Sequence, residues 1–428
     1  MPDSAPCRAA VAVVRTLRAH GHVAFLVGGC VRDLLIGRSP KDYDVATAAR
    51  PKQVLRLFAD VVQVGVSFGV VRVRQPVGDG DICDVEVATF RADGKYSDGR
   101  RPDSVRFAGA RQDVLRRDFT INGLLADPDR RDMATVCDWV GGIDDLRAGR
   151  LRCIGDPVER FGEDALRLLR APRFAARFGL VVEPATAAAI RALGPTLAKV
   201  SAERITAELT AMLGEGTALP ALALLVDLGL APVVWPELVA MDPGLREARL
   251  RCERALAELA AGPTGGDLPR ASWQIPMTLA VLAGSDRAWP ERPEFAATLR
   301  LNRSEFQAVR RILALTGASA LPVPGPGPWP AAVARWLRDP LADAALVALH
   351  AGDPAGPWSQ WRQLRAAWPA AAAFPDLGFG GDDLRAWGYA AGPSFRSALA
   401  AAEDVRLQGG ATADAEAAAR AVLDANLT

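Results

Sequence analysis

Two short acidic pairs stand in β-branched runs near the start of the chain. Asp42 and Asp44 flank Tyr43 and open one run, and Asp84 and Glu86 alternate with Val and Ile in another. Alternate residues of a strand share a face, so each pair presents two carboxylates that repel each other unless a cation lies between them. Mg²⁺ prefers such hard oxygen ligands together with substrate phosphates. We therefore expect Asp42 and Asp44 to be metal ligands, with one acid of the second pair completing a triad.

A glycine pair lies just before the first acidic pair. Gly28 and Gly29 follow an apolar run and precede a short helical pattern. Paired glycines let the backbone approach a ligand closely, and the free N–H groups of a following helix favour a phosphate. For an isolated glycine pair, a tight turn without a ligand is the better explanation. The neighbouring acids make a phosphate-binding turn the better explanation here. Metal ions held by carboxylates would activate a 3′-hydroxyl and neutralise a departing pyrophosphate, so the combination indicates nucleotidyl transfer.

The elements that must position these residues differ between the first 140 residues and the rest of the chain. The first part alternates β-rich and helical patterns, whereas the remainder has the 3.6-residue periodicity of helices joined by Gly and Pro. An α+β protein is therefore expected, with a head of strands and helices followed by an all-helical part. The expected strands are 23–27, 43–46, 61–64, 70–74 and 82–90, and the expected linkers are 262–269 and 321–330.

Length and composition limit the possible classes. A chain of 428 residues exceeds the size at which one hydrophobic core usually stops growing, so two or more domains are expected. The formal net charge of +1 favours no polyanionic partner by itself, so any basic surface must be local. Only three His are present, and acid, base and metal chemistry must therefore fall to carboxylates.

The cysteines and the apolar segments indicate a compartment. The six Cys are scattered without a C-x-x-C pair, which is typical of free thiols in a reducing cytoplasm. The N-terminus lacks the charged and apolar regions of a secretory signal. The most apolar stretch, 219–235, is interrupted by Pro, Asp and Gly, so a buried helix and loop are expected there and no membrane span. No protein partner is evident.

Several motifs in one order resemble a known family. They are GGCVRD, DYD, EVATFR, RRDFTIN and EDALRLLRAPRFAARFGL, followed by SAERITAEL. In this order and spacing the chain is similar to the class II tRNA nucleotidyltransferases, which comprise CCA-adding enzymes and bacterial poly(A) polymerases. The resemblance implies a nucleotidyltransferase head with a mixed β-sheet, then an all-α neck, body and tail, at 1–140, 141–212, 213–320 and 331–428. It also implies Mg²⁺ as cofactor, ATP and CTP as substrates, and the tRNA 3′ end and acceptor stem as partner.

The same resemblance assigns roles to individual residues. It implies that Asp42 and Asp44 bind magnesium and that Glu86 is the third catalytic carboxylate. Contacts with the triphosphate and sugar of the incoming nucleotide are implied for Gly28, Gly29, Arg32, Arg117, Asp118 and Asn122. Arg170 and Arg173 are also assigned to nucleotide binding by the resemblance.

Asp164 and Arg167 predict how the base is chosen. They are three residues apart, so on one helix they would share a face. Cytosine and adenine present an amino donor beside a ring-nitrogen acceptor, whereas uracil and guanine present a carbonyl beside a ring N–H. An Asp acceptor next to an Arg donor would accept C and A and leave unpaired groups against U and G. A surface ion pair is the alternative reading of an isolated Asp-x-x-Arg.

Two further residues bear on that helix. Pro172 lies between Arg170 and Arg173, and an interior Pro removes a backbone donor and tends to kink a helix, which affects the direction of Arg173. The resemblance also implies that the motif around Arg204 braces the helix that carries the base-reading pair.

The segment from Arg91 to Phe107 helps to choose among relatives. It is rich in Gly and charge, so a mobile loop is expected, and in the family such a loop supports the switch from C to A addition. Its presence argues against an enzyme that adds only CC, and no extra basic segment typical of poly(A) polymerases precedes Gly21. Addition of CCA is the favoured function, with A addition or poly(A) synthesis as the alternative. An RNA-binding module without chemistry or a small-molecule nucleotidyltransferase explains fewer of the motifs.

Overall fold

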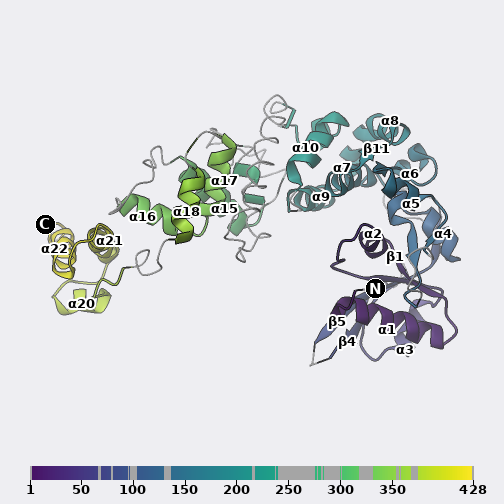
Figure 1. Cartoon of the computed structure of the whole chain (residues 1–428), viewed down its shortest axis with the longest axis horizontal. Coiled ribbons are helices and arrows are strands. Elements are labelled where there is room, and N and C mark those ends of the chain that lie inside the picture. The colour runs from purple at the N-terminus through teal and green to yellow at the C-terminus, as the bar shows by residue number, and fades with distance from the viewer. Residues whose placement is uncertain are drawn as a thin grey trace. The chain divides into compact units, whose positions relative to one another are not determined.

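The computed structural model describes residues 2–65, 69–78, 81–94, 96, 104–129, 136–214, 217–236, 238–239, 301–317, 331–352, 356, 358–367 and 375–426, with a few positions between 275 and 299. It divides into two compact units, Met1–Asp242 and Pro243–Thr428 (Figure 1). The finer boundaries at 140, 212 and 320 stay predictions. The expected linkers 262–269 and 321–330 lie outside the described residues.

The first unit begins with a mixed seven-stranded sheet in the order β3-β4-β5-β2-β1-β8-β9. β2 and β5 pair in parallel, and the other neighbours are antiparallel. All five expected strands are confirmed with ends shifted by one or two residues. The bounds are β1 Ala24–Val27, β2 Asp44–Thr47, β3 Val61–Gly65, β4 Val70–Pro76, β5 Ile82–Thr89, β8 Leu124–Ala126 and β9 Cys137–Asp138.

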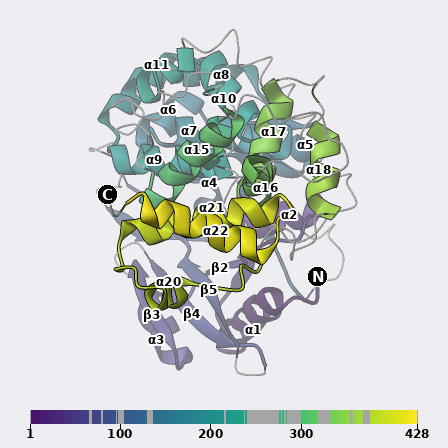
Figure 2. The same cartoon turned by 90° about the vertical axis from the view of Figure 1, so that its left-hand side faces the viewer.

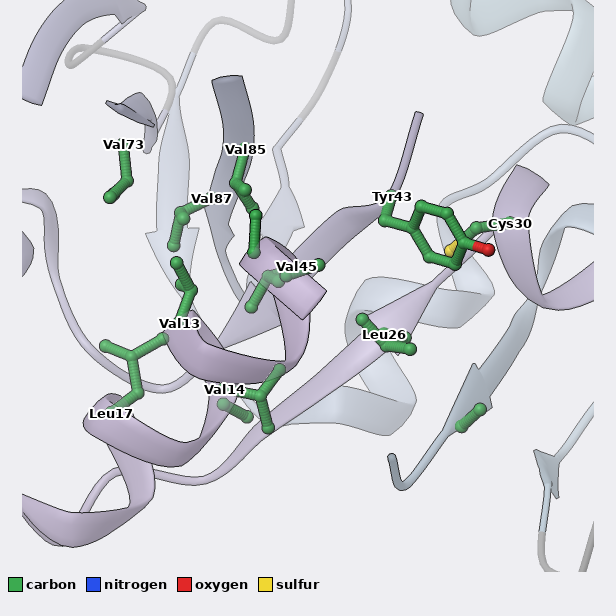
Figure 3. Packing of buried hydrophobic residues seen from close by; sticks show 14 of the residues in the cluster. Val13, Val14, Leu17, Leu26, Cys30, Tyr43, Val45, Val73, Val85 and Val87 are labelled. Atoms are coloured by element: carbon green, nitrogen blue, oxygen red, sulfur yellow. The ribbon is translucent and has the colours of Figure 1, made fainter. Parts of the chain in front are cut away.

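α1 (Ala5–Ala19) covers one face of this sheet. Its N-terminus is capped by the Ser4 hydroxyl, which accepts a hydrogen bond from the Cys7 N–H at 3.4 Å. Val13, Val14 and Leu17 recur at helical spacing and are completely buried against the inward-facing residues of β1, β2 and β5 (Figure 3). The opposite surface of these strands is thereby left for the acidic residues. Further helices of the head are α2 Gly29–Leu35, α3 Pro51–Leu57, α4 Ala110–Leu115 and the 3₁₀ turn η2 Thr120–Asn122.

The segment expected to be a loop is paired at its two ends. β6 (Arg91–Asp93) and β7 (Val105–Phe107) form a two-stranded antiparallel sheet in which Arg91 is opposite Phe107. Strands of three residues are too short to give a recognisable alternation, which explains why a loop was expected. Residues 95 and 97–103 of the segment lie outside the described part.

Helices dominate the rest of the first unit, as expected. One correction concerns β10 (Arg150–Leu151) and β11 (Val181–Val182), which form a short parallel pair inside the part expected to be all-helical. The expected buried helix and loop at 219–235 are present as α10 and α11. No described helix has the length and apolar character needed to cross a membrane. The helices are α5 Gly142–Arg147, α6 Pro157–Glu163, α7 Arg167–Phe178, α8 Pro184–Leu193, η4 Gly194–Lys199, α9 Ala202–Gly214, α10 Ala218–Asp227 and α11 Ala231–Val234.

The described part of the second unit is helical. α21 and α22 lie side by side (Figures 1 and 2) and share a small core with α20, built largely from alanines such as Ala398, Ala402 and Ala415. Glu403 on α21 is paired with Arg335 and Arg338 on α16. The bounds are α15 Arg303–Thr316, α16 Ala331–Arg338, α17 Ala342–Gly352, α18 Trp358–Ala367, α20 Gly381–Ala386, α21 Pro393–Leu407 and α22 Thr412–Asp424.

Candidate active site

The predicted carboxylates stand on two neighbouring strands. Asp44 begins β2, and the parallel register that pairs Val45 with Val87 places Asp44 next to Glu86 on β5. Tyr43 is only 3% exposed, and Figure 3 shows its ring within the core beside the Cys30 side chain. Asp42 and Asp44 on either side of Tyr43 are exposed, as is Glu86. The alternation expected of extended backbone therefore turns these acids out of the core toward one surface.

The acids also influence each other electrostatically. Desolvation by the surrounding protein and the charge of Glu86 raise the pKa of Asp44 to about 6, with a further contribution from Asp42, while Arg117 acts in the opposite direction. A divalent cation would relieve this repulsion, and carboxylate oxygens suit Mg²⁺. Within the described ranges, no three acidic, His or Cys side chains are gathered closely enough to hold a metal unaided. Asp42 and Asp44 fit an ion that takes its remaining ligands from a substrate and water.

Asp84 lies in a different environment. Its carboxylate is 3.6 Å from Nη1 of Arg72 and 3.9 Å from Nε of Arg74, both on β4. Two residues farther along β5, Glu86 is the acid beside Asp44. The strand register therefore places Glu86, and not Asp84, next to Asp44, and its role as the third carboxylate stays a prediction.

The predicted glycine turn meets an arginine. Gly28 has φ 74°, a backbone conformation that favours glycine, and its N–H donates to the Leu124 carbonyl at 3.0 Å. A Cβ added at Gly28 would lie 3.1 Å from Nη1 of Arg117. Nε of Arg117 is buried without an acceptor among the described residues. Nη1 of this guanidinium therefore lies at the glycine turn, and the phosphate contacts expected of Gly28 and Arg117 stay predictions.

A chain of hydrogen bonds joins the remaining head residues to α7. Nη1 of Arg32 donates to Oδ1 of Asn122 at 2.6 Å, and Nδ2 of Asn122 donates to Asp118 at 3.0 Å. Asp118 in turn accepts from Nε of Arg170 at 2.7 Å. Burial alone would raise the pKa of Asp118, but the charge of Arg170 and the hydrogen bonds from Asn122 and Arg170 lower it to about 2. Four residues whose roles were predicted separately therefore form one hydrogen-bonded group. Gly29 lies beside this group, since a Cβ added at Gly29 would be 3.5 Å from Nη2 of Arg32.

The expectation that Asp164 and Arg167 share one helical face is wrong. α6 ends at Glu163, Asp164 is extended with φ −144° and ψ 104°, and α7 begins at Arg167. The Asp164 side chain accepts a hydrogen bond from the Leu166 N–H at 3.1 Å. Asp side chains often bind nearby backbone N–H groups in this way and so interrupt a helix. The i,i+3 spacing of the two residues therefore bridges a helix break.

Asp164 and Arg167 each have other partners. Asp164 accepts hydrogen bonds from Nη2 of Arg204 on α9 at 2.9 and 3.1 Å, which agrees with the expected bracing role of Arg204. Arg167 donates to Glu163 at 2.6 Å and to the Arg116 carbonyl at 3.1 Å. Both side chains are therefore oriented by contacts outside the pair.

Arg170 and Arg173 both reach toward Glu208 on α9. Nη1 of Arg173 is 2.8 Å from the Glu208 carboxylate, and Nη1 of Arg170 is 3.8 Å from it. α7 continues past Pro172 to Phe178, so the proline does not end the helix. Arg170 belongs to the group around Asp118, whereas the nucleotide contact of Arg173 stays a prediction.

The sequence analysis did not identify two acids, Asp113 and Glu208, that bind arginines near the site. Asp113 is completely buried and binds Arg116 and Arg117, three and four residues later, at 2.6 and 3.0 Å. That spacing makes side chains neighbours on a helix and was the available signal. Glu208 contacts arginines of a different helix, and no local spacing indicates this.

Two family models match parts of this chain. A family model described as the poly A polymerase head domain matches residues 24–152, and one described as the probable RNA and SrmB-binding site of polymerase A matches residues 179–241. The head match contains the carboxylates, the glycine turn and the residues bound to it.

Relatives match over most of the chain. The CCA-adding enzyme of Geobacillus stearothermophilus is 35% identical over 393 residues, covering 85% of this chain and 92% of that protein. The CCA-adding enzyme of Limosilactobacillus fermentum is 33% identical over 398 residues, covering 90% and 89%. The crystal structure of the Bacillus stearothermophilus CCA-adding enzyme in complex with CTP has a TM-score of 0.70 at 29% identity and covers 96% of this chain and 94% of that one. The chain therefore belongs to the family of CCA-adding enzymes, which are RNA nucleotidyltransferases.

Proposed function

We propose that this protein adds C, C and A in turn to the 3′ end of tRNA, using CTP and ATP and no nucleic-acid template. The observation that carries the proposal is the placement of Asp44 and Glu86 on adjacent parallel strands, with Asp44 within the electrostatic influence of Arg117, which borders the Gly28 turn. A head of this kind in a chain 35% identical to a CCA-adding enzyme supports nucleotide addition to RNA.

Asp42 and Asp44 would hold Mg²⁺. When bound, the ion would polarise the α-phosphate and favour ionisation of the primer 3′-hydroxyl. Burial and the neighbouring acids raise the pKa of Asp44 only to about 6, so its carboxylate remains mostly ionised and able to bind metal at neutral pH. Glu86 faces the same space and would complete the acidic group beside the primer hydroxyl.

The Gly28 turn and the arginines around it would bind the triphosphate. Arg117 would present its Nη1 at the turn, and Arg32 is only 4% exposed and fixed through Asn122. Asp118 and Asn122 would hold the ribose, and a hydrogen bond to the 2′-hydroxyl would select ribonucleotides. Arg170 keeps Asp118 ionised as an acceptor.

Asp164 and Arg167 would read the base. Asp164 accepts from the Leu166 N–H at Oδ1 and from one nitrogen of Arg204 at both oxygens. A carboxylate has about four acceptor positions, so about one remains for the amino group of C or A. Arg167 would donate to the ring nitrogen. Since both side chains are fixed by neighbours, U and G would leave buried groups unpaired.

The helical part would contact the tRNA acceptor stem. Recognition there would depend on phosphate contacts and shape, because the deep groove of an RNA duplex hides its base edges. We place the activity in the cytoplasm. The described cysteines, Cys7, Cys30, Cys83, Cys137 and Cys153, are free thiols, which suits a reducing compartment, and Cys252 lies outside the described residues.

One experiment tests the proposal against its alternatives. Purified protein is incubated with Mg²⁺ and three tRNAs, ending at the discriminator base, after one C and after CC, with CTP, ATP or both, and the products are sequenced. We expect completion of CCA on all three substrates and no further extension. Addition to the CC-ending tRNA alone would indicate an A-adding enzyme, and long A tails would indicate a poly(A) polymerase. No extension of any tRNA would contradict nucleotide addition itself.

A further inference from the structure

Asp113 on α4 is a completely buried carboxylate that binds two arginines at once. Its Oδ1 accepts from Nε and Nη2 of Arg116 at 2.9 and 2.6 Å, and its Oδ2 accepts from Nη2 of Arg117 at 3.0 Å. The backbone N–H of Arg91 also donates to Oδ1 at 3.3 Å. Burial opposes ionisation, but the charges of Arg117 and Arg116 hold the pKa of Asp113 below its usual range. The carboxylate is therefore charged and fully engaged.

The Oδ2 side of Asp113 fixes the arginine of the phosphate turn. Asp113 binds Nη2 of Arg117, while Nη1 of the same guanidinium borders Gly28 and its Nε is buried without an acceptor among the described residues. A guanidinium is planar and rigid, so fixing one nitrogen fixes the direction of the others. Asp113 thereby sets the edge that Arg117 presents at the Gly28 turn.

The Oδ1 atom of Asp113 is connected through Arg116 to Arg167, one of the two residues proposed to read the base. Arg116, bound there, offers its backbone carbonyl to Nη2 of Arg167 at 3.1 Å. Nη1 of Arg116 is 3.7 Å from Asp93 at the end of β6. A shift of Arg116 would therefore move a contact of Arg167 and loosen the β6–β7 hairpin.

We propose that Asp113 is a positioning residue that orients Arg117 for the triphosphate and Arg167 for the base through one carboxylate. Asp113 touches no substrate and acts only through its two arginines. The inference rests on the proposed function, because it assigns Asp113 a role in selecting and holding the incoming nucleotide. A purely structural ion pair is the competing explanation, since breaking any buried pair is destabilising.

Asp145 provides a matched control. It is also 0% exposed and binds two arginines, Arg150 at 2.6 Å and Arg152 at 2.8 Å, together with Thr120 at 2.7 Å. Asp113→Asn and Asp145→Asn each remove one buried negative charge between two guanidiniums. Both substitutions should lower the thermal midpoint of unfolding. A change in KM or in nucleotide preference that occurs in only one variant therefore depends on where the carboxylate lies and not on lost stability.

The measurement is steady-state addition of CMP and of UMP to tRNA ending at the discriminator base, at a temperature where circular dichroism shows every variant folded. For Asp113→Asn we expect the KM for CTP to rise by about tenfold, kcat to change much less, and the CTP-over-UTP preference to fall. Asp145→Asn should keep the wild-type KM and preference. Equal effects in the two variants, or an Asp113→Asn protein that folds at no temperature while Asp145→Asn folds, would overturn the proposal.

A double-mutant cycle tests the route through Arg117. If Asp113 acts on triphosphate binding through Arg117, Asp113→Asn should raise the KM for CTP no further in an Arg117→Ala protein. Additive increases would contradict this route. Wild-type protein that adds no nucleotide to any tRNA would instead refute the proposed function, so the two failures are distinguishable.

Discussion

Asp164 is bound to Arg204 on α9, by hydrogen bonds of 2.9 and 3.1 Å, although it lies in the connection between α6 and α7. The two side chains are 20% and 22% exposed, so water screens the pair only partly. The same carboxylate also accepts from the nearby Leu166 N–H at 3.1 Å. The orientation of Asp164, the proposed base-reading acceptor, therefore depends in part on a contact from a different helix.

Replacing Arg204 should impair nucleotide choice without removing any group that touches the nucleotide. In Arg204→Ala the Asp164 carboxylate loses its orienting donor, and we expect the preference for CTP over UTP to fall by about tenfold. Competition between labelled CTP and UTP on one tRNA measures it. Arg191→Ala is the control, because Arg191 is an exposed arginine on α8 bound only to the Asp227 carbonyl among the contacts described, and it should keep the wild-type preference.

Removing the acceptor itself should have a larger effect on selectivity. Asp164→Ala leaves the amino group of C or A without its partner and removes the mismatch that rejects U and G, so incorporation of all four nucleotides should become more equal. Single-nucleotide addition with each triphosphate in turn measures this. An unchanged order of preference would exclude Asp164 from base reading.

The Gly28 turn should be sensitive to one added methyl group. Gly28→Ala forces a side chain into φ 74° and within 3.1 Å of Arg117, so we expect a loss of the order of a hundredfold in kcat/KM for CTP. Gly37→Ala is a matched control, because Gly37 has φ 71° but nothing within 4 Å of the added carbon. Similar kinetic losses in both variants would mean that backbone strain, and not the approach to Arg117, is responsible.

Asp118 should make stability depend on acidity. The folded-state pKa of Asp118, about 2, lies below the usual value of 3.8, so its contribution to folding stability is present above about pH 4 and is lost as the pH falls toward 2. The Asp118→Asn protein should be less stable than wild type by about 2 kcal/mol at neutral pH, and this difference should shrink below pH 4. Urea unfolding of both proteins at several pH values provides the test. A difference that stays constant down to pH 2 would show that the charge of Asp118 is not stabilising.

The strands and the acidic pairs were predictable from sequence for a local reason. Val45, Val85 and Val87 alternate with acids, and this period of two reports which residues face the core regardless of distant contacts. Asp44 and Glu86 become neighbours because β2 and β5 pair in parallel with Val45 opposite Val87. The predicted glycine turn required only that Gly28 adopt a positive φ, which it does.

Other features depend on contacts between distant segments and were not predictable. The sequence around Asp164 is compatible with one long helix, and the break occurs where its side chain accepts from the Leu166 N–H and from Arg204. The β6–β7 pairing depends on strands too short to show a period. Glu208 gives no local signal, because its arginine partners lie on another helix.

Asp42 and Asp44 are proposed to gather Mg²⁺ around an incoming triphosphate. The most direct test of this proposal is the rate of a single CMP addition to tRNA ending at the discriminator base by the Asp44→Asn protein, beside wild type and Asp84→Asn, with tRNA binding measured in parallel. Metal assistance is worth several kcal/mol, so we predict a loss of about a thousandfold for Asp44→Asn, undiminished tRNA binding, and near wild-type addition by Asp84→Asn, whose carboxylate pairs with Arg72 and Arg74. Addition by Asp44→Asn at a rate close to that of wild type would contradict the proposal.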